Sequence, residues 1–228
     1  MMRYVWLAVL LTAICPAGAR PQDAAGSDPA RRITEISEKI LHAFARLGEV
    51  SCEVEAQYFR EGKEDKKYCF TWFQEKEGVT RVTFSRPYPG LSASYKSGDR
   101  HVTVKPFPYL SFIKFKLSLY HPLLRTPSGQ RMDQASLEYL SRFFYANVHL
   151  IQRHQSAFSE GSEKVALSFW AANYTGGTDL NRYYVTVSKD NHFPLRIERH
   201  NTGGDPIEVI VFTDFVVHHG KDKRRTEK

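Results

Sequence analysis

Nine histidines are the first residues to test for chemistry. None lies in an HExxH or comparable metal-ligating spacing, and the adjacent pair His218 and His219 has no spaced partner. The sequence contains neither a GxSxG nucleophile motif nor a glycine-rich loop that opens a helix to bind phosphate. Glu208 and Asp214 could pair as catalytic carboxylates, but strand alternation favours solvent-facing positions for both. These patterns predict a protein that is not an enzyme and uses no metal or other cofactor.

The N-terminus has the pattern of a cleaved secretory signal peptide over residues 1–19. Arg3 supplies a positive charge, residues 4–14 form an apolar run too short to span a membrane, and residues 17–19 (Ala-Gly-Ala) form a cleavage site. Cleavage there removes Cys15, and the alternative of a lipidated Cys15 is disfavoured by the bulky Ile14 before it. We therefore expect an exported chain with a linker over residues 20–27, one domain over 28–219 and a charged, disordered tail over 220–228.

The two remaining cysteines, Cys52 and Cys69, are predicted to form a disulfide in an oxidising compartment. A hairpin that places them opposite each other closes with a turn over residues 59–62 and brings their Cα atoms within the range that a disulfide tolerates. The alternative is two buried free thiols. The formal net charge is +7, but no stretch interleaves Lys and Arg with exposed aromatics as a nucleic-acid platform does. The charge is compatible with a weak attraction to anionic lipid head groups.

The centre of the sequence, residues 68–106, predicts an antiparallel meander with one apolar face. Four runs alternate between apolar and polar residues, and Gly78, residues 87–90 and Gly98 separate them at turns too short for parallel crossovers. A further alternating strand over residues 50–58 precedes the meander. Past it, strands are predicted over residues 150–155, 165–172, 183–189, 195–200 and 207–216.

Two amphipathic helices are available to cover this apolar face. The first is predicted between Asp28 and Gly48, and the second begins at Asp133 as its N-cap. The segment over residues 107–130 is apolar and broken by prolines, so we expect it to pack over the protein as a flap or second lid. This is more cover than one sheet face requires, which favours a lidded cavity of roughly several hundred Å³. The alternative is a filled hydrophobic core.

The order of these elements resembles the LolA-like group of periplasmic lipoprotein-carrier and lipoprotein-sorting proteins. The matching pieces are Trp72-Phe73, residues 81–87 (RVTFSRP), residues 97–106 and residues 193–215. The resemblance implies an α+β, mainly β fold: a strongly curved antiparallel sheet, or unclosed half-barrel, with amphipathic helices as a lid in its concave face. One difference is that Glu75-Lys76 stands where the carrier has an Arg-Pro whose arginine ties the lid shut.

The resemblance also implies a function and a set of sites. We expect a monomeric periplasmic carrier of lipid or lipoprotein acyl chains, with membrane proteins as donor and acceptor; the alternative is a periplasmic protein-interaction or sensor module with a filled core. Candidate head-group residues are Arg81 and Arg86. Candidate lid residues are Ile36, Ile40, Phe44, Phe112, Phe115, Leu137 and Phe143. The candidate cavity lining is Phe70, Trp72, Val82, Phe84, Leu91, Ala93, Tyr95, Val102, Val104, Phe169 and Tyr183.

Overall fold

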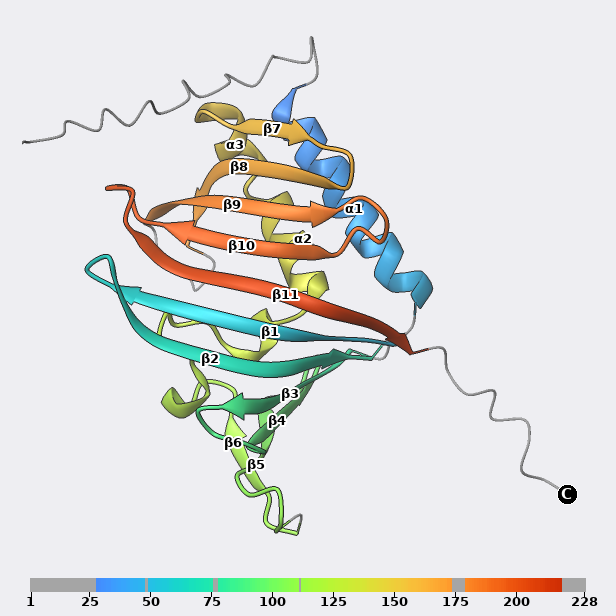
Figure 1. Ribbon diagram of the computed structural model, residues 1–228, viewed down its shortest axis with the longest axis vertical. Coiled ribbons are helices and arrows are strands. Elements are labelled where there is room, and N and C mark those ends of the chain that lie inside the picture. The colour runs from blue at the N-terminus through green and yellow to red at the C-terminus, as the bar shows by residue number, and fades with distance from the viewer. Residues whose placement is uncertain (1–27, 48, 76–77, 111, 174–178, 219–228) are drawn as a thin grey trace, which may run out of the picture.

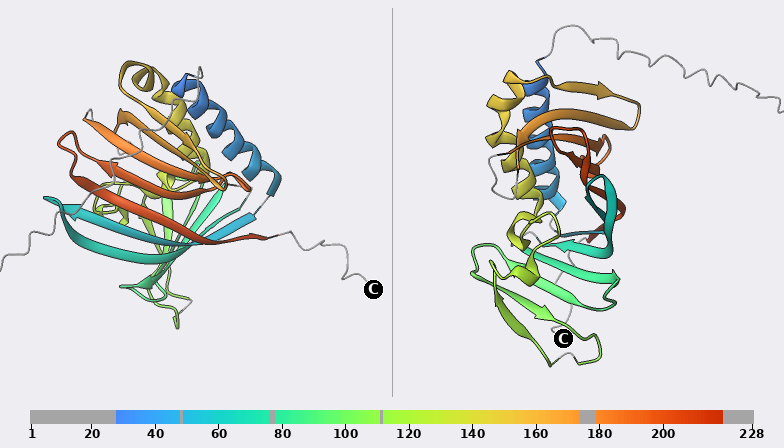
Figure 2. Two further views of the ribbon diagram at one scale, coloured as in Figure 1. Left: turned by 45° about the horizontal axis from the view of Figure 1, so that its top comes forward. Right: turned by 90° about the vertical axis from the view of Figure 1, so that its left-hand side faces the viewer.

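The computed structural model describes residues 28–47, 49–75, 78–110, 112–173 and 179–218. The predicted signal peptide, linker and tail lie outside these residues. The described chain forms one 11-stranded sheet in the order β6-β5-β4-β3-β2-β1-β11-β10-β9-β8-β7 (Figure 1). Every neighbouring pair is antiparallel, and the sheet is curved and not closed (Figure 2). The predicted fold class is therefore confirmed.

The strands leave the centre of the sheet in two directions. β1 pairs with β11, so the first strand and the last strand of the chain meet in the middle, with β2 to β6 on one side and β7 to β10 on the other. The strand bounds are β1 Glu49–Arg60, β2 Lys63–Gln74, β3 Val79–Arg86, β4 Ser92–Lys96, β5 His101–Lys105, β6 Phe115–Ser118, β7 Ala157–Glu160, β8 Lys164–Ala172, β9 Leu180–Ser188, β10 Pro194–His200 and β11 Pro206–His218.

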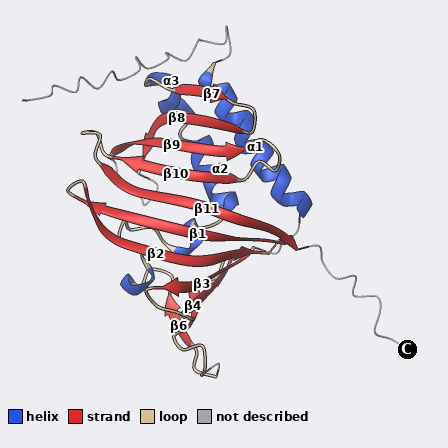
Figure 3. Ribbon diagram, viewed as in Figure 1, coloured by secondary structure: helices blue, strands red, loops and turns tan. Residues whose placement is uncertain are grey.

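The helices are α1 (Pro29–Leu47), α2 (Leu137–Ala146) and α3 (Val148–Arg153), with short 3₁₀ turns η1 (Pro122–Leu124) and η2 (Met132–Gln134) before α2 (Figure 3). α1 begins as predicted, with the Asp28 carboxylate accepting a hydrogen bond from the Ala30 N–H at 3.0 Å. The predicted cap of the second helix was wrong: Asp133 lies in η2, and the Ser136 hydroxyl caps α2. None of the described helices has the length and apolarity needed to cross a membrane.

The strand predicted over residues 150–155 was also wrong. Residues 148–153 form α3, and the strand follows at β7. A short apolar run does not distinguish a strand from a helix by its period, so neighbouring elements decide. Here Asn147 ends α2 and begins α3, and Ile151 of α3 is buried in the core.

The predicted disulfide is not present: Cys52 and Cys69 are free thiols on opposite faces of the sheet. Cys52 lies opposite Trp72 on the buried face, whereas Cys69 lies opposite Glu55. The hairpin closes with only two residues at its tip, Glu61 (φ 52°) and Gly62 (φ 74°), rather than four. The shorter turn shifts the pairing by two residues, and a β-bulge between Tyr58 and Phe59 adds one more. Because the total shift of three residues is odd, it places the two cysteines on opposite faces. Burial raises the pKa of the Cys52 thiol to about 12.

Two different covers lie over the concave face of the sheet. The helices lie over the half that holds β7 to β11, and the segment over residues 119–136 crosses the other half (Figure 2). The prediction for the proline-broken segment is thus met in part, because Leu119 of this segment is buried in the hydrophobic core and Leu124 packs against it. Several apolar side chains earlier in the segment are exposed instead.

Candidate functional site: the covered concave face

The predicted cavity-lining residues share one face of the sheet. Trp72 lies opposite Cys52 and Val82, Ala93 lies between Val82 and Val104 on the neighbouring strands, and all of them point toward the covers. Each predicted lining residue is either buried in the core or packs against it. Strand alternation therefore identified the apolar face correctly on both halves of the sheet.

α2 closes this face with aromatic side chains. Phe144 meets Phe169 edge-on at 5.2 Å between ring centroids, and Phe143 lies 5.2 Å from Tyr183. Such pairs stabilise packing beyond the area that they bury. Among the predicted lid residues, Ile36, Ile40 and Phe143 are buried in the core. Phe112 and Phe115 are exposed instead, and the side chains of Phe44 and Leu137 lie outside the described residues.

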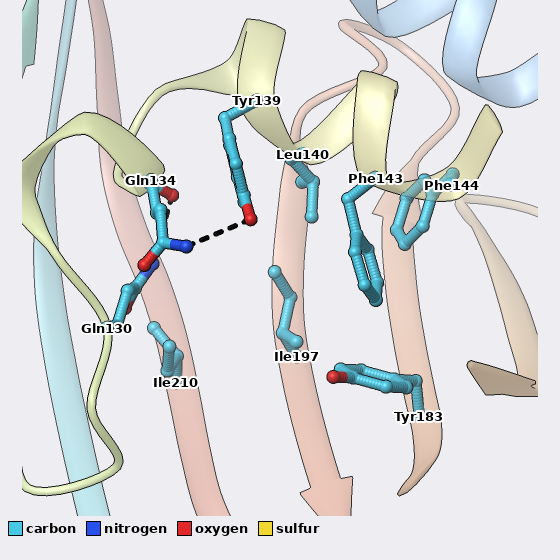
Figure 4. Close-up of a pocket in the computed structure, with 9 residues that line it drawn as sticks. All are labelled: Gln130, Gln134, Tyr139, Leu140, Phe143, Phe144, Tyr183, Ile197 and Ile210. Atoms are coloured by element: carbon cyan, nitrogen blue, oxygen red, sulfur yellow. Dashed lines mark hydrogen bonds between the residues drawn. The ribbon is translucent and has the colours of Figure 1, made fainter. Parts of the chain in front are cut away.

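An apolar cavity of about 40 Å³ lies where the two covers meet the sheet (Figure 4). It has room for about three water molecules, so it is far smaller than the several hundred Å³ predicted from the sequence. The reason is that Phe143 and Phe144 fill the space between α2 and the strands. Its lining comes from the proline-broken segment, from α2 and from three strands: Gln130, Gln134, Tyr139, Leu140, Phe143, Phe144, Tyr183, Ile197 and Ile210. Of the predicted lining residues, only Tyr183 borders the cavity.

Polar contacts fasten the covers where they join. The Trp72 indole N–H donates to the Ala135 carbonyl at 2.9 Å, which ties the sheet to the residues just before α2. The buried Gln134 amide donates to the Tyr139 hydroxyl at 3.0 Å, as the dashed line in Figure 4 marks. These hydrogen bonds join η2, α2 and β2 in one cluster.

Asn147 fastens the far end of α2. Its amide N–H donates to the Phe143 carbonyl at 2.8 Å, and its side-chain oxygen accepts a hydrogen bond from the Ala172 N–H at 3.0 Å. The residue is buried, so both bonds are shielded from water. α2 is thus held at both ends by single side chains, a feature that was not predicted from the sequence.

A buried ion pair lies beneath the proline-broken segment. Arg199 of β10 and Glu208 of β11 are opposite each other, 1% and 0% exposed, with Nε and Oε1 3.1 Å apart. The placement predicted for Glu208 on the solvent face was wrong, because β11 has apolar residues on both faces and alternation alone did not choose between them. Asp214 is exposed, as predicted, and the two carboxylates do not form a site.

Arg199 connects the sheet to the proline-broken segment and to the residue that follows β8. Its Nη1 donates to the Asn173 side-chain oxygen at 2.5 Å, and its Nη2 donates to the Ser128 carbonyl at 3.5 Å. Nearby, Tyr58 hydrogen-bonds Thr126, while burial and the Glu208 carboxylate raise the pKa of Tyr58 above its usual range. The turn over residues 126–130 therefore lies on a buried polar cluster. This cluster attaches the proline-broken segment to the sheet. The attachment does not involve Glu75-Lys76, the position where the carrier family has its lid-tying arginine.

The candidate head-group arginines do not border the cavity. Arg81 lies opposite Phe73 and Ser94 on the face away from the helices, 3.6 Å from the Glu75 carboxylate and with its guanidinium over the Phe73 ring. Arg86 is exposed and donates to the Cys69 sulfur at 3.5 Å. The structure does not bring either residue to the cavity.

The fold and its covered concave face define an open half-barrel with a helical lid, which is the architecture that the LolA-like resemblance implies. No protein-family model and no curated sequence matches the chain.

The chain is similar to several solved structures at low identity. With an uncharacterized conserved protein from Thermus thermophilus it shares 10% identity at a TM-score of 0.48, covering 83% of this chain and 90% of that one. With a LolA superfamily protein from Nitrosomonas europaea it shares 14% identity at a TM-score of 0.36, covering 84% of this chain and 97% of that one. With the lipoprotein LppX of Mycobacterium tuberculosis it shares 11% identity at a TM-score of 0.44, covering 84% of this chain and 100% of that one.

Proposed function

We propose that this protein is a periplasmic, non-enzymatic carrier that binds an acyl chain of a lipid or lipoprotein on the concave face of its sheet. The observation that carries the proposal is the apolar cavity at the point where two separate covers meet. One cover is an amphipathic helix held at its two ends, and the other is an irregular segment held by a buried polar cluster. A cavity at such a junction widens when either cover moves.

Burial of the acyl chain supplies the binding energy. Each CH₂ group removed from water contributes about 0.8 kcal/mol. Moving α2 breaks the hydrogen bonds from Trp72 and Asn147, each with a net contribution of about 1 kcal/mol, and separates Phe143 and Phe144 from the sheet. An acyl chain that takes the place of these rings offsets that loss. The free energy gained on binding the acyl chain is then nearly equal to the free energy lost on moving α2. A carrier that both loads from a donor and releases to an acceptor requires such a balance.

Native mass spectrometry of the protein purified without detergent tests the proposal. We expect discrete adducts with the masses of acyl lipids, which organic extraction removes. Ile210→Trp should diminish these adducts because the larger side chain fills the cavity that Ile210 lines. Val216→Trp is the matched control, since Val216 lies on the same strand and is exposed. Both variants should keep the far-ultraviolet circular dichroism spectrum of the parent.

A second candidate function is a protein-interaction module whose core is simply filled. The observation in its favour is the cavity volume of about 40 Å³, which leaves little space without movement of a cover. A single bare mass that also takes up no added fatty acid or phospholipid would favour this second candidate. It would refute the carrier proposal.

A further inference from the structure

The loop between β5 and β6, residues 106–114, exposes an unusual concentration of large apolar side chains. Tyr109 is 94% exposed and Phe112 is 78% exposed, and more than a third of the surface of Phe107, Leu110 and the adjoining first residue of β6, Phe115, is also accessible. The loop forms the tip of the molecule at the end opposite β7 (Figure 1). Isolated apolar residues are common on protein surfaces, but five within nine positions form a patch that marks an interaction site.

The loop is held in this exposed position by its own base. Gly90 has a φ of +81°, and a Cβ at that position would lie 2.5 Å from the Pro108 ring, so Pro108 packs directly on the Gly90 backbone. At the tip, the Ile113 N–H donates to the Leu110 carbonyl at 2.9 Å and closes a turn. The aromatic side chains therefore project from a fixed frame and do not fold back over the concave face.

The stretch of sequence that contains the loop carries charges of one sign. The sequence has no Asp or Glu from Arg100 to Met132, a stretch that contains six Lys and Arg residues: Arg100, Lys105, Lys114, Lys116, Arg125 and Arg131. Lys105, Lys114 and Lys116 border the loop and are exposed. Contrary to the expectation from the sequence, residues 112–116 (FIKFK) are a stretch in which lysines alternate with exposed aromatic side chains. Its aromatics became recognisable as exposed only in the structure.

We propose that the β5–β6 loop docks the protein on the surface of an anionic lipid bilayer. Tyr109 and Phe112 enter the interface, where aromatic side chains place their rings among the head groups and upper acyl chains. Lys105, Lys114 and Lys116 remain at the level of the anionic head groups, with their aliphatic stems along the apolar surface. This inference goes beyond the carrier function and does not depend on whether the concave face binds a cargo.

The position of β6 at the edge of the sheet accounts for only part of this pattern. Lysines on an edge strand prevent pairing with other strands, which is a sufficient reason for Lys116. It is not a reason for exposed Tyr109 and Phe112, since these lie in the loop and beyond the paired residues of β6. The absence of Asp and Glu from residues 100–132 also exceeds what edge protection needs. Both features are the ones that an anionic membrane surface selects.

Co-sedimentation with vesicles tests the proposal directly. We expect the protein to bind vesicles of phosphatidylcholine mixed with phosphatidylglycerol, and to bind vesicles of phosphatidylcholine alone far more weakly. Each lysine near an anionic surface strengthens binding about fivefold, so Lys114→Gln with Lys116→Gln should weaken it about 25-fold. The matched control is Lys63→Gln with Lys66→Gln, two exposed lysines on the β1–β2 hairpin. Mass spectrometry verifies that all variants have the same N-terminus. Any contribution of the N-terminus to vesicle binding is therefore equal in all variants and cancels when they are compared.

The apolar contribution is tested separately. Tyr109→Ser with Phe112→Ser should reduce vesicle binding at least tenfold without changing the unfolding midpoint, because neither side chain packs in the core. Tyr145→Ser with Val216→Ser, exposed residues elsewhere, is the control. A Phe112→Trp variant adds a reporter whose fluorescence should shift to the blue on anionic vesicles and be quenched by brominated lipid.

Three outcomes would overturn the proposal. The first is equal binding to neutral and anionic vesicles, and the second is undiminished binding by the loop variants. The third is an absence of vesicle binding together with loop-dependent binding to a purified protein, which would make the loop a protein-docking surface. Acyl adducts in native mass spectrometry are a separate readout. Failure of the docking proposal can therefore be distinguished from failure of the carrier proposal.

Discussion

Removing one member of the buried ion pair should destabilise this protein more than any surface change. Arg199 and Glu208 are 1% and 0% exposed, so Glu208→Leu leaves a guanidinium without its carboxylate in the interior. Breaking a buried pair in this way costs about 3–5 kcal/mol. For a domain of this size, that corresponds to a fall of about 10 °C in the unfolding midpoint.

A double variant distinguishes the cost of leaving one buried charge unpaired from the cost of losing the hydrogen bonds around the ion pair. Arg199→Met combined with Glu208→Leu removes both charges, so its cost should be limited to the hydrogen bonds that Arg199 donates to Asn173 and Ser128, about 1 kcal/mol each. The double variant should therefore be more stable than either single variant. Urea unfolding followed by circular dichroism measures the three free energies and their coupling.

The same strand supplies the control. Arg196 and Glu198 form an ion pair at 2.6 Å on β10, but their side chains are 46% and 27% exposed. Glu198→Ala should therefore cost less than about 1 kcal/mol. If Glu208→Leu costs no more than Glu198→Ala, the buried cluster beneath the proline-broken segment does not exist as described. The account of how that cover is attached would then be wrong.

Three further variants or measurements test particular contacts. Without reductant, Cys69 should react with iodoacetamide while Cys52 stays unmodified until unfolding, and mass spectrometry that finds the two joined would contradict the register. Trp72→Phe removes the N–H that holds the cover and should lower the free energy of unfolding by about 1–2 kcal/mol while increasing acyl uptake; unchanged stability and uptake would refute this role. Gly90→Ala should displace Pro108 and weaken vesicle binding, whereas a fully retained affinity would show that the loop needs no fixed base.

In the strands with one apolar face, alternation of apolar and polar residues was enough to predict which side chains face the covers, because it depends only on the two-residue period of a strand. β11 is apolar on both faces, and there alternation placed Glu208 wrongly. Register was not predictable by the same means. The position of the hairpin tip at Glu61 and Gly62 depends on which residues adopt a positive φ. A β-bulge between Tyr58 and Phe59 then adds one residue to the register, and this odd shift places Cys69 on the face opposite Cys52. The predicted Cys52–Cys69 disulfide failed for this reason.

Contacts between distant parts of the chain were beyond local patterns. Glu208 is buried because β11 pairs with β1 on one side and with β10 on the other, which places it opposite Arg199 under the cover. The sequence contains one signal of this contact: Arg199 and Glu208 lie on either side of the tight turn at residues 201–205, at positions that a hairpin brings together. That signal indicates that the two residues are neighbours, but it does not reveal that a third segment buries both.

The segment over residues 106–136 shows where composition stops being informative. Large apolar residues occur throughout this segment of the sequence, yet Leu119 is buried in the core and Tyr109 is exposed. What separates them is position relative to β6, whose pairing with β5 divides the segment into a loop before it and a cover after it. Of the residues before β6, Pro108 packs on Gly90, whereas Tyr109 and Phe112 are exposed, and the docking proposal assigns their apolar character to an external partner. Residues after it return over the concave face and find the partner within the chain. One apolar sequence thus supplies both a cover for the sheet and a surface for the membrane.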